Sequence, residues 1–108
     1  MTSETEYKPL KRLIKKTTIE NLWLYLLTEL KKGDQHPYAL IKIIQEKYSF
    51  NPGKVLPYVV LKKLERENFV KSYNKDNRHY YKITNKGIQL LDEGASFLRN
   101  ILKMITEN

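Results

Sequence analysis

Residues 54–86 read KVLPYVVLKKLERENFVKSYNKDNRHYYKITNK, and the pattern of side chains changes once within this stretch. Over residues 55–68 the apolar positions recur at helical spacing and Pro57 suits a first helical turn, which predicts a helix. Residues 69–73 and 79–83 are instead rich in aromatic and β-branched side chains. The stretch therefore predicts a helix followed directly by a β-hairpin, whose tip between the two strands is polar and basic.

The predicted helix has an apolar side and a basic side. Its apolar residues share one face and are expected to point inward: Pro57, Val60, Leu61 and Leu64. The outward set is basic, aromatic or apolar: Lys54, Tyr58, Val59, Lys62, Lys63 and Arg66. A helix about 14 residues long fits the major groove of duplex DNA, where flanking Lys and Arg displace counterions from phosphates. Segment 54–68 is therefore predicted to lie in the major groove.

The net charge of the chain is concentrated in this part of the sequence. The 108 residues carry 20 Lys and Arg against 12 Asp and Glu, a net charge of +8. Of this excess, +3 falls on residues 1–16, 0 on residues 17–52, +6 on residues 53–86 and −1 on residues 87–108. A charged surface that is merely solvated would not segregate in this way. A polyanionic partner is expected, with nucleic acid ahead of an anionic membrane.

Candidate DNA contacts come from two segments. The first set lies in or just before the predicted helix: Asn51, Lys54, Tyr58, Val59, Lys62 and Lys63. The second set lies in the predicted wing, residues 74–79: Lys75, Asn77, Arg78 and His79. Near the helix start, Lys54 and Tyr58 are spaced to reach base edges or phosphates together. The wing is expected to lie across the adjacent backbone or to enter the minor groove, where a narrow A·T tract attracts Arg.

Two further helices are predicted upstream. Thr17 and Glu20 have the spacing of a capping box, so a helix is expected to begin at Thr17 and to end at Gly33. Pro37 opens a second helix that ends near Tyr48, before a turn at residues 51–53. The basic residues 1–16 form either an arm or a short amphipathic helix, and the pattern alone does not choose between them.

A last helix is predicted over residues 85–106, with Thr84 as its cap. Its apolar positions have heptad spacing: Ile88, Leu91, Ala95, Leu98, Leu102 and Ile105. A second apolar stripe makes the helix apolar over more of its circumference than one small domain would cover: Leu90, Phe97, Ile101 and Met104. The helix is therefore expected to pack on a second copy of the chain. Gly94 either permits a close helix approach or is simply tolerated.

These elements predict one domain of the α+β class, mainly helical. The expected architecture is a winged helix-turn-helix, three helices plus a β-hairpin wing, with a C-terminal dimerisation helix. The boundaries are residues 1–16 for the N-terminal arm or helix, 17–84 for the DNA-binding domain and 85–108 for the dimerisation helix.

Several other classes of protein do not fit the sequence. No cysteine is present, and with His36 and His79 as the only histidines no zinc site is expected, even with assistance from Asp34. No nucleophile with a base, phosphate-binding glycine loop or carboxylate pair stands out, so neither an enzyme nor a cofactor is expected. The longest apolar run, residues 22–27, is far shorter than the roughly 20 residues of a membrane span. With no secretory signal at the start, we expect a cytoplasmic protein without a membrane partner.

Most aromatic residues are expected to be structural. Trp23 lies on the apolar stripe of its helix and is expected in the core, rather than stacking on a ligand. Four tyrosines fall on apolar faces and are expected to pack: Tyr25, Tyr38, Tyr48 and Tyr81. The exceptions are Tyr58 and Tyr80, which are free to contact nucleic acid.

Three motifs resemble the PadR-like family of winged-helix regulators, and the resemblance spans most of the chain, from about residue 23 to residue 91. His-Pro-Tyr at residues 36–38 stands where that family has His-Gly-Tyr at the opening of its second helix. Residues 58–65 are similar to the family's tyrosine-bearing run that ends in Leu, basic, basic, Leu, Glu, with Val59 in place of its usual Pro. Residues 78–87 resemble the family's Arg, Tyr-Tyr, Ile-Thr, Lys-Gly signature, the most specific of the three.

The resemblance implies a homodimeric DNA-binding protein, usually a transcriptional repressor, whose C-terminal helix builds the dimer. Its expected partners are a palindromic or pseudo-palindromic duplex and a second copy of the chain. Some relatives release DNA on binding a small planar ligand, but nothing in this sequence indicates such an effector. The fold is also similar to that of archaeal plasmid segregation proteins that spread along DNA. Segregation, with a partner protein, is therefore the alternative to transcription regulation.

Overall fold

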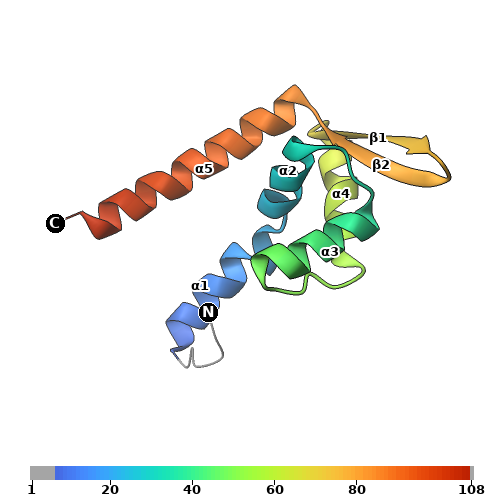
Figure 1. Ribbon diagram of the computed structural model, residues 1–108. Coiled ribbons are helices and arrows are strands. Elements are labelled where there is room, and N and C mark those ends of the chain that lie inside the picture. Colours follow the sequence, from blue (N-terminus) through green and yellow to red (C-terminus); the bar gives the residue numbers. More distant parts are fainter. Residues whose placement is uncertain (1–6, 108) are drawn as a thin grey trace.

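A computed structural model describes residues 7–107 of the chain. Its elements follow in the order α1 (Lys8–Thr17), a 3-10 turn η1 (Ile19–Asn21), α2 (Trp23–Lys32), α3 (Pro37–Tyr48), α4 (Leu56–Arg66), β1 (Val70–Lys75), β2 (Arg78–Ile83) and α5 (Asn85–Thr106). The hairpin lies beside the group formed by α2, α3 and α4, while α5 extends away from it as a long arm (Figure 1). This arrangement is a winged helix-turn-helix with an added C-terminal helix, as the sequence predicted.

The N-terminal part differs from the prediction in where its helices begin. Residues 8–17 form a helix rather than an arm, whereas residues 1–6 of the predicted N-terminal segment lie outside the described residues. The predicted capping box is wrong, because both of its side chains serve α1. The Thr17 hydroxyl donates to the carbonyl of Leu13 at 2.7 Å, and Glu20 accepts from Lys16 at 2.7 Å. A 3-10 turn follows, and α2 begins at Trp23 without a side-chain cap.

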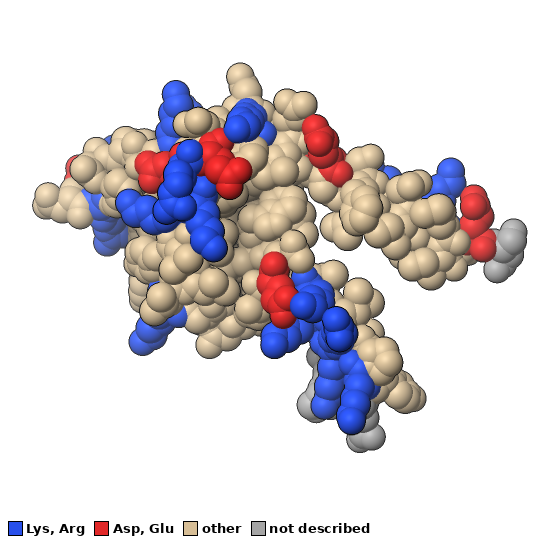
Figure 2. Space-filling view, turned by 180° about the vertical axis from the view of Figure 1, so that it is seen from behind, with Lys and Arg blue, Asp and Glu red and all other residues tan. Residues whose placement is uncertain are grey.

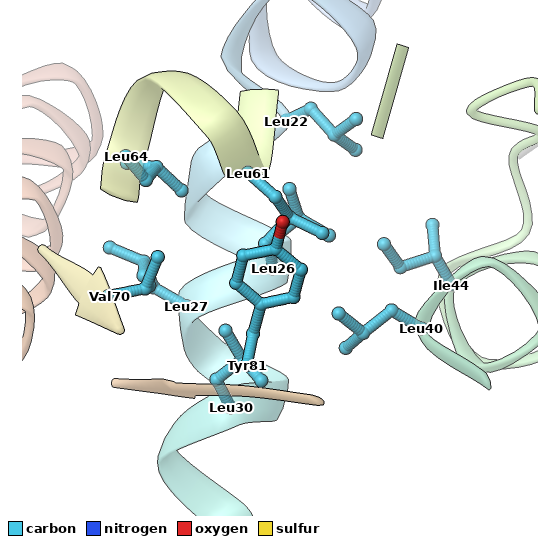
Figure 3. Close-up of a cluster of buried hydrophobic side chains, with 10 residues drawn as sticks. All are labelled: Leu22, Leu26, Leu27, Leu30, Leu40, Ile44, Leu61, Leu64, Val70 and Tyr81. Atoms are coloured by element: carbon cyan, nitrogen blue, oxygen red, sulfur yellow. The ribbon is translucent and has the colours of Figure 1, made fainter. Parts of the chain in front are cut away.

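The core is formed where the helical group meets the hairpin, and Figure 3 shows its side chains converging from both. Its buried residues come from the η1–α2 segment, α3, α4 and the two strands: Leu22, Leu26, Leu27, Leu30, Leu40, Ile44, Leu61, Leu64, Val70 and Tyr81. Their burial is the main source of stability, at about 25 cal/mol per Å² of apolar surface. Because Leu61 and Leu64 fix the inward side of α4, the opposite side of that helix faces outward.

One carboxylate, Glu29 of α2, is buried with the core and is 6% exposed. It accepts a hydrogen bond from the hydroxyl of Tyr48 at 2.5 Å and from the ammonium of Lys47 at 3.0 Å, which joins α2 to the end of α3. Burial alone would raise the pKa of Glu29. The two donors and the nearby Lys32 outweigh burial, so the pKa of Glu29 lies below its usual value. Burial and the neighbouring carboxylate raise the pKa of Tyr48 to about 12.

The hairpin has longer strands and a shorter tip than predicted. Lys75 pairs with Arg78 as the last residues of the ladder, so residues 74, 75 and 78 belong to strands rather than to the tip. The turn consists of Asp76 and Asn77, whose φ values are 52° and 63°. Two consecutive residues with positive φ give the tight turn that matches the twist of a hairpin, and Asp and Asn tolerate that conformation.

Helix α5 begins and ends where the sequence predicted. The Thr84 hydroxyl oxygen accepts from the backbone N–H of Gly87 at 3.1 Å, which confirms the predicted cap. At Gly87 a Cβ would lie 2.2 Å from the carbonyl oxygen of Phe69, so only glycine fits. Further along, a Cβ at Gly94 would lie 2.9 Å from Cη2 of Trp23, so Gly94 does permit a close approach of α5 to α2. Trp23 packs against the core, as expected.

Candidate nucleic-acid interface

The outward side of α4 is exposed, as its sequence pattern predicted. The exposed residues at its centre are Tyr58, Val59, Lys62 and Lys63. Lys54 is also exposed but lies two residues before the first residue of the helix, so it extends the face from the preceding turn. The Lys62 ammonium is 4.0 Å from the carboxylate of Glu65, a separation that leaves the lysine available to another anion.

Asn51 shapes the turn that leads into α4. Its side-chain oxygen accepts from the backbone N–H of Gly53 at 2.8 Å and from the amide of Gln45 at 3.1 Å. These bonds hold the turn in the geometry that Asn side chains commonly impose on the two residues after them. Within residues 7–107, the side-chain NH₂ of Asn51 is the part that remains for a ligand.

The hairpin presents an unusual row of side chains on one face. The register places three pairs directly opposite one another on that face: Lys71 with Lys82, Tyr73 with Tyr80, and Lys75 with Arg78. Like charges directly opposite each other destabilise a hairpin, so two cationic pairs on one face oppose folding. Such an arrangement is favourable when a polyanion lies across the strands and neutralises both pairs.

The hairpin is held against the link between α2 and α3 by polar and aromatic contacts. The hydroxyl of Tyr73 donates to Asp34 at 2.6 Å, and the Tyr73 ring stacks on Tyr80 at 5.7 Å between centroids. Tyr80 in turn meets the ring of His36 edge-on at 5.5 Å. Arg78, which the sequence placed at the wing tip, folds back so that its Nη1 lies 2.8 Å from Nε2 of His36. The wing therefore has a fixed position relative to the start of α3.

Two hollows flank Tyr58 on the same side of the molecule. One has a volume of about 400 Å³ and lies between α3, α4 and the wing, and its polar lining is His36, Tyr38, Tyr58, Lys62, Arg78 and His79. The other, of about 490 Å³, is lined by Tyr38, Ile41, Lys42, Gln45, Lys54 and Tyr58. Among the described residues no carboxylate lines either hollow, while each contains two cationic side chains. Both hollows therefore favour anionic groups.

The prediction that Tyr38 packs on an apolar face is wrong. Its side chain is 64% exposed and lines both hollows. It stands on the first turn of α3, where its ring stacks parallel to His36 at 6.4 Å. The other three tyrosines expected to pack do so, with Tyr25 and Tyr48 partly buried and Tyr81 in the core.

Sequence reasoning also missed the place of His36 in this interface. Its Nδ1 accepts from the backbone N–H of Ala39 at 3.3 Å, so it caps α3. The signal available in the sequence was a polar residue immediately before Pro37, the position of a helix cap. No spacing rule connects His36 to Arg78, which is 42 residues away along the chain.

Helix α5 carries an apolar surface on its distal half. The first heptad positions, Ile88, Leu91 and Ala95, are partly buried against their own domain. The exposed apolar residues follow them: Phe97, Leu98, Leu102, Met104 and Ile105. On the face seen in Figure 2, the middle of the arm formed by α5 is mostly uncharged, whereas α1 carries a cluster of Lys and Arg.

Residues 7–107 offer neither a metal site nor a membrane span. No group of three or more His, Cys, Asp or Glu residues in this range is placed to hold a metal ion. Over the same range, no helix combines the length and apolar character needed to cross a membrane.

Comparison with known proteins gives a family and a set of similar structures. The model of the transcriptional regulator PadR-like family matches residues 26–93. A PadR family transcription regulator from Clostridium difficile R20291 is similar with a TM-score of 0.73 and 27% identity, over 79% of this chain and 94% of that chain. A transcriptional regulator from Clostridium thermocellum is similar with a TM-score of 0.71 and 26% identity, over 79% of this chain and 89% of that chain.

A structure with DNA has the same fold. Bacillus subtilis PadR in complex with operator DNA is similar with a TM-score of 0.61 and 23% identity, over 68% of this chain and 46% of that chain. A comparison with curated protein sequences gave no match. Because the family model covers more than half of the chain, and the winged-helix structures agree with it, this chain belongs to the PadR-like family of transcriptional regulators.

Proposed function

We propose that this protein binds double-stranded DNA as a homodimer and represses transcription. Helix α4 lies in the major groove, and the wing, residues 74–79, lies on the adjacent backbone or in the minor groove. Support comes from one observation above all: Tyr58 and Lys62 on the outward face of α4 and Arg78 of the wing line the same hollow, which lacks carboxylates among the described residues.

The residues divide into two roles. Those in the turn before α4 and in its first turn read base edges, because the N-terminal part of a recognition helix enters the groove first: Asn51, Lys54, Tyr58 and Val59. Those further along α4 and on the wing neutralise phosphates or line the minor groove: Lys62, Lys63, Lys75, Asn77, Arg78 and His79. Bacillus subtilis PadR, which has the same fold, has been crystallised with its operator DNA, and this supports duplex DNA as the ligand here.

The dimer is built by α5. Leu98, Leu102 and Ile105 are exposed at heptad spacing, and a second α5 covers them in a coiled seam. The partly buried positions Ile88, Leu91 and Ala95 extend the same row toward the domain. A two-fold dimer places the two α4 helices about one turn of DNA apart, roughly 34 Å, which requires a palindromic or pseudo-palindromic site.

Fluorescence anisotropy with a labelled duplex, measured over a range of salt concentrations, tests this function. The wild-type protein is expected to bind, with log K falling linearly with log salt concentration. Replacing Lys62 and Lys63 together by Ala is expected to weaken binding and to reduce the slope by about 0.9 for each lost phosphate contact. Lys31→Ala removes a cation that instead pairs with Asp92 of α5, and it is the matched control. Equal losses in both variants, or no binding by the wild type at low salt, would contradict the proposal.

A further inference from the structure

The contact between His36 and Arg78 contains a conflict of hydrogen-bond donors. Nδ1 of His36 faces the backbone N–H of Ala39 at 3.3 Å, and Nε2 faces Nη1 of Arg78 at 2.8 Å. Both neighbours are donors, since a guanidinium has no acceptor. A neutral imidazole has only one acceptor nitrogen, so His36 cannot satisfy both neighbours.

An anionic oxygen beside the pair removes the conflict. If Nδ1 keeps its bond to Ala39, the proton lies on Nε2, and Nε2–H and the guanidinium then form two adjacent donors. Two adjacent donors, one of them charged, suit a single phosphate oxygen, because hydrogen bonds between charged partners are the strong ones. Within the described residues no carboxylate lines the surrounding hollow, so the protein itself offers no such acceptor there.

The surroundings of the pair are built for an anion. The hollow also contains the ammonium of Lys62, the hydroxyl of Tyr58 and the imidazole of His79. These groups come from α4 and β2, while His36 belongs to the link before α3. The edge-on contact of Tyr80 with the His36 ring holds the imidazole from the side of the wing. The His36 imidazole is therefore held in place before a ligand arrives, which reduces the entropy cost of binding.

We propose, resting on the DNA-binding function above, that the notch between His36 and Arg78 binds one phosphodiester of the DNA backbone. A non-bridging oxygen accepts from His36 Nε2–H and from the Arg78 guanidinium together. The notch adjoins the outward face of α4, so a duplex held by that helix brings its backbone to the notch. His36 thereby has two roles, as the cap of α3 through Nδ1 and as a phosphate ligand through Nε2.

The tautomer of His36 tests this assignment without any substitution. Two-bond ¹H–¹⁵N correlation spectra report which imidazole nitrogen carries the proton, and His79, the other histidine, is the comparison in the same spectrum. In the complex with a duplex we expect a protonated Nε2 and an unprotonated Nδ1 for His36. An unprotonated Nε2 in the complex would overturn the proposal.

Inorganic phosphate, added without DNA at constant ionic strength, separates the two sources of a phosphate group. We expect no change in the His36 signals at phosphate concentrations that match the total duplex phosphate. The same shifts produced by inorganic phosphate alone would assign the notch to free phosphate and overturn the assignment to DNA.

A double-mutant cycle measures whether the two side chains act on the same group. His36→Asn retains an oxygen that caps α3, since Asn is a favoured cap, but it removes Nε2. This variant is expected to lose affinity by roughly tenfold, the effect of one hydrogen bond to a charged group. With Arg78→Ala already in place, His36→Asn should cost little more, because the shared phosphate has already been lost.

The outcomes separate this inference from the function on which it rests. Additive losses, or an unchanged affinity in His36→Asn with the thermal midpoint also unchanged, would overturn the phosphate role of His36 while leaving DNA binding intact. No binding of the duplex by the wild-type protein would overturn both.

Discussion

Tyr81 of the hairpin and Gln35 of the α2–α3 link exchange both of their backbone hydrogen bonds, at 2.8 Å and 3.2 Å. The link therefore forms an isolated antiparallel bridge to β2, beside the two-stranded sheet. The side chain of Tyr81 is 2% exposed and anchors the same residue in the core. This double attachment brings His36 beside Tyr80 and Arg78, so the wing is positioned by the helical domain rather than by the hairpin alone.

Substitutions at the start of α4 are expected to change sequence preference. Lys54→Ala or Tyr58→Ala should reduce the ratio of affinity for the preferred site to affinity for random duplex by about tenfold, since a base contact contributes roughly 1–3 kcal/mol of discrimination. Competition titrations with both duplexes measure this ratio. A loss of affinity that is equal for both duplexes would show that these residues contact only the backbone.

Substitutions on the wing are expected to act in the opposite way. Arg78→Ala or Lys75→Ala removes a cation from the exposed pair next to the turn. Affinity should fall to a similar extent for every duplex, with the salt slope reduced by about 1 for each lost phosphate contact. Unchanged affinity in these two variants, together with unchanged affinity in the two α4 variants, would mean that the proposed orientation on DNA is wrong.

The distal half of α5 is expected to control the oligomeric state. Leu98→Glu combined with Leu102→Glu places two charges in the proposed seam, and the variant should sediment as a monomer and lose specific binding, because buried unpaired charges are strongly unfavourable. Ser96→Glu with Asn100→Glu adds the same charges at exposed polar positions of the same helix with the same spacing. That control should remain a dimer. A dimer that persists with both leucines replaced would rule out this seam.

Gly87 is expected to be essential for the junction between the hairpin and α5. Gly87→Ala places a Cβ 2.2 Å from the backbone oxygen of Phe69, so the junction must shift, at a cost of about 1–3 kcal/mol in the free energy of unfolding. Gly33 is the matched control, because its backbone is extended and a Cβ at this position would have no atom within 4 Å. Urea denaturation of both alanine variants measures the difference. Equal stabilities would contradict the close approach at Gly87.

The buried carboxylate of Glu29 is expected to make the free energy of unfolding depend on pH in the acidic range. Because its pKa is lowered in the fold, the ionised group stabilises the protein above its ordinary pKa, and this contribution is lost as the pH falls through the lowered value. At pH 7 Glu29→Gln should cost about 2 kcal/mol, since a hydrogen-bonded charge becomes a neutral amide. The difference between wild type and variant should shrink steadily below about pH 4. Urea denaturation of both proteins at pH 7 and pH 3 measures this difference in stability. A difference that is the same at both pH values would show that Glu29 does not cause the acid dependence.

The sequence predicted those parts of the fold that depend on local patterns. Thr84 and the apolar periodicity after it gave both ends of α5, and the two faces of α4 were assigned correctly. The predicted start of α2 at Thr17 is wrong. Thr17 instead ends the helix on its N-terminal side, where its hydroxyl donates to the carbonyl of an earlier residue. A local pattern does not show which of the two helices such a side chain serves.

The candidate interface was only partly predictable. The outward position of the basic and aromatic residues of α4 and the wing was predicted because charge and periodicity coincide there. The cationic cross-strand pairs were not predicted, because the strand register depends on a two-residue turn that places Lys75 opposite Arg78. The neighbourhood of His36 depends on the backbone pairing of Gln35 with Tyr81, a contact between distant parts of the chain. Such contacts follow from tertiary packing and leave no mark on sequence periodicity.

The most direct test of the central claim is a DNase I footprint over the DNA that surrounds the gene for this protein, across a titration of the protein. A dimer with two α4 helices in successive major grooves predicts one bounded, palindromic footprint whose length does not change once it is filled. Protection that begins at one site and extends along the flanking DNA as the concentration rises would contradict a simple dimeric repressor and indicate a spreading protein. No protection at low salt would contradict DNA binding altogether.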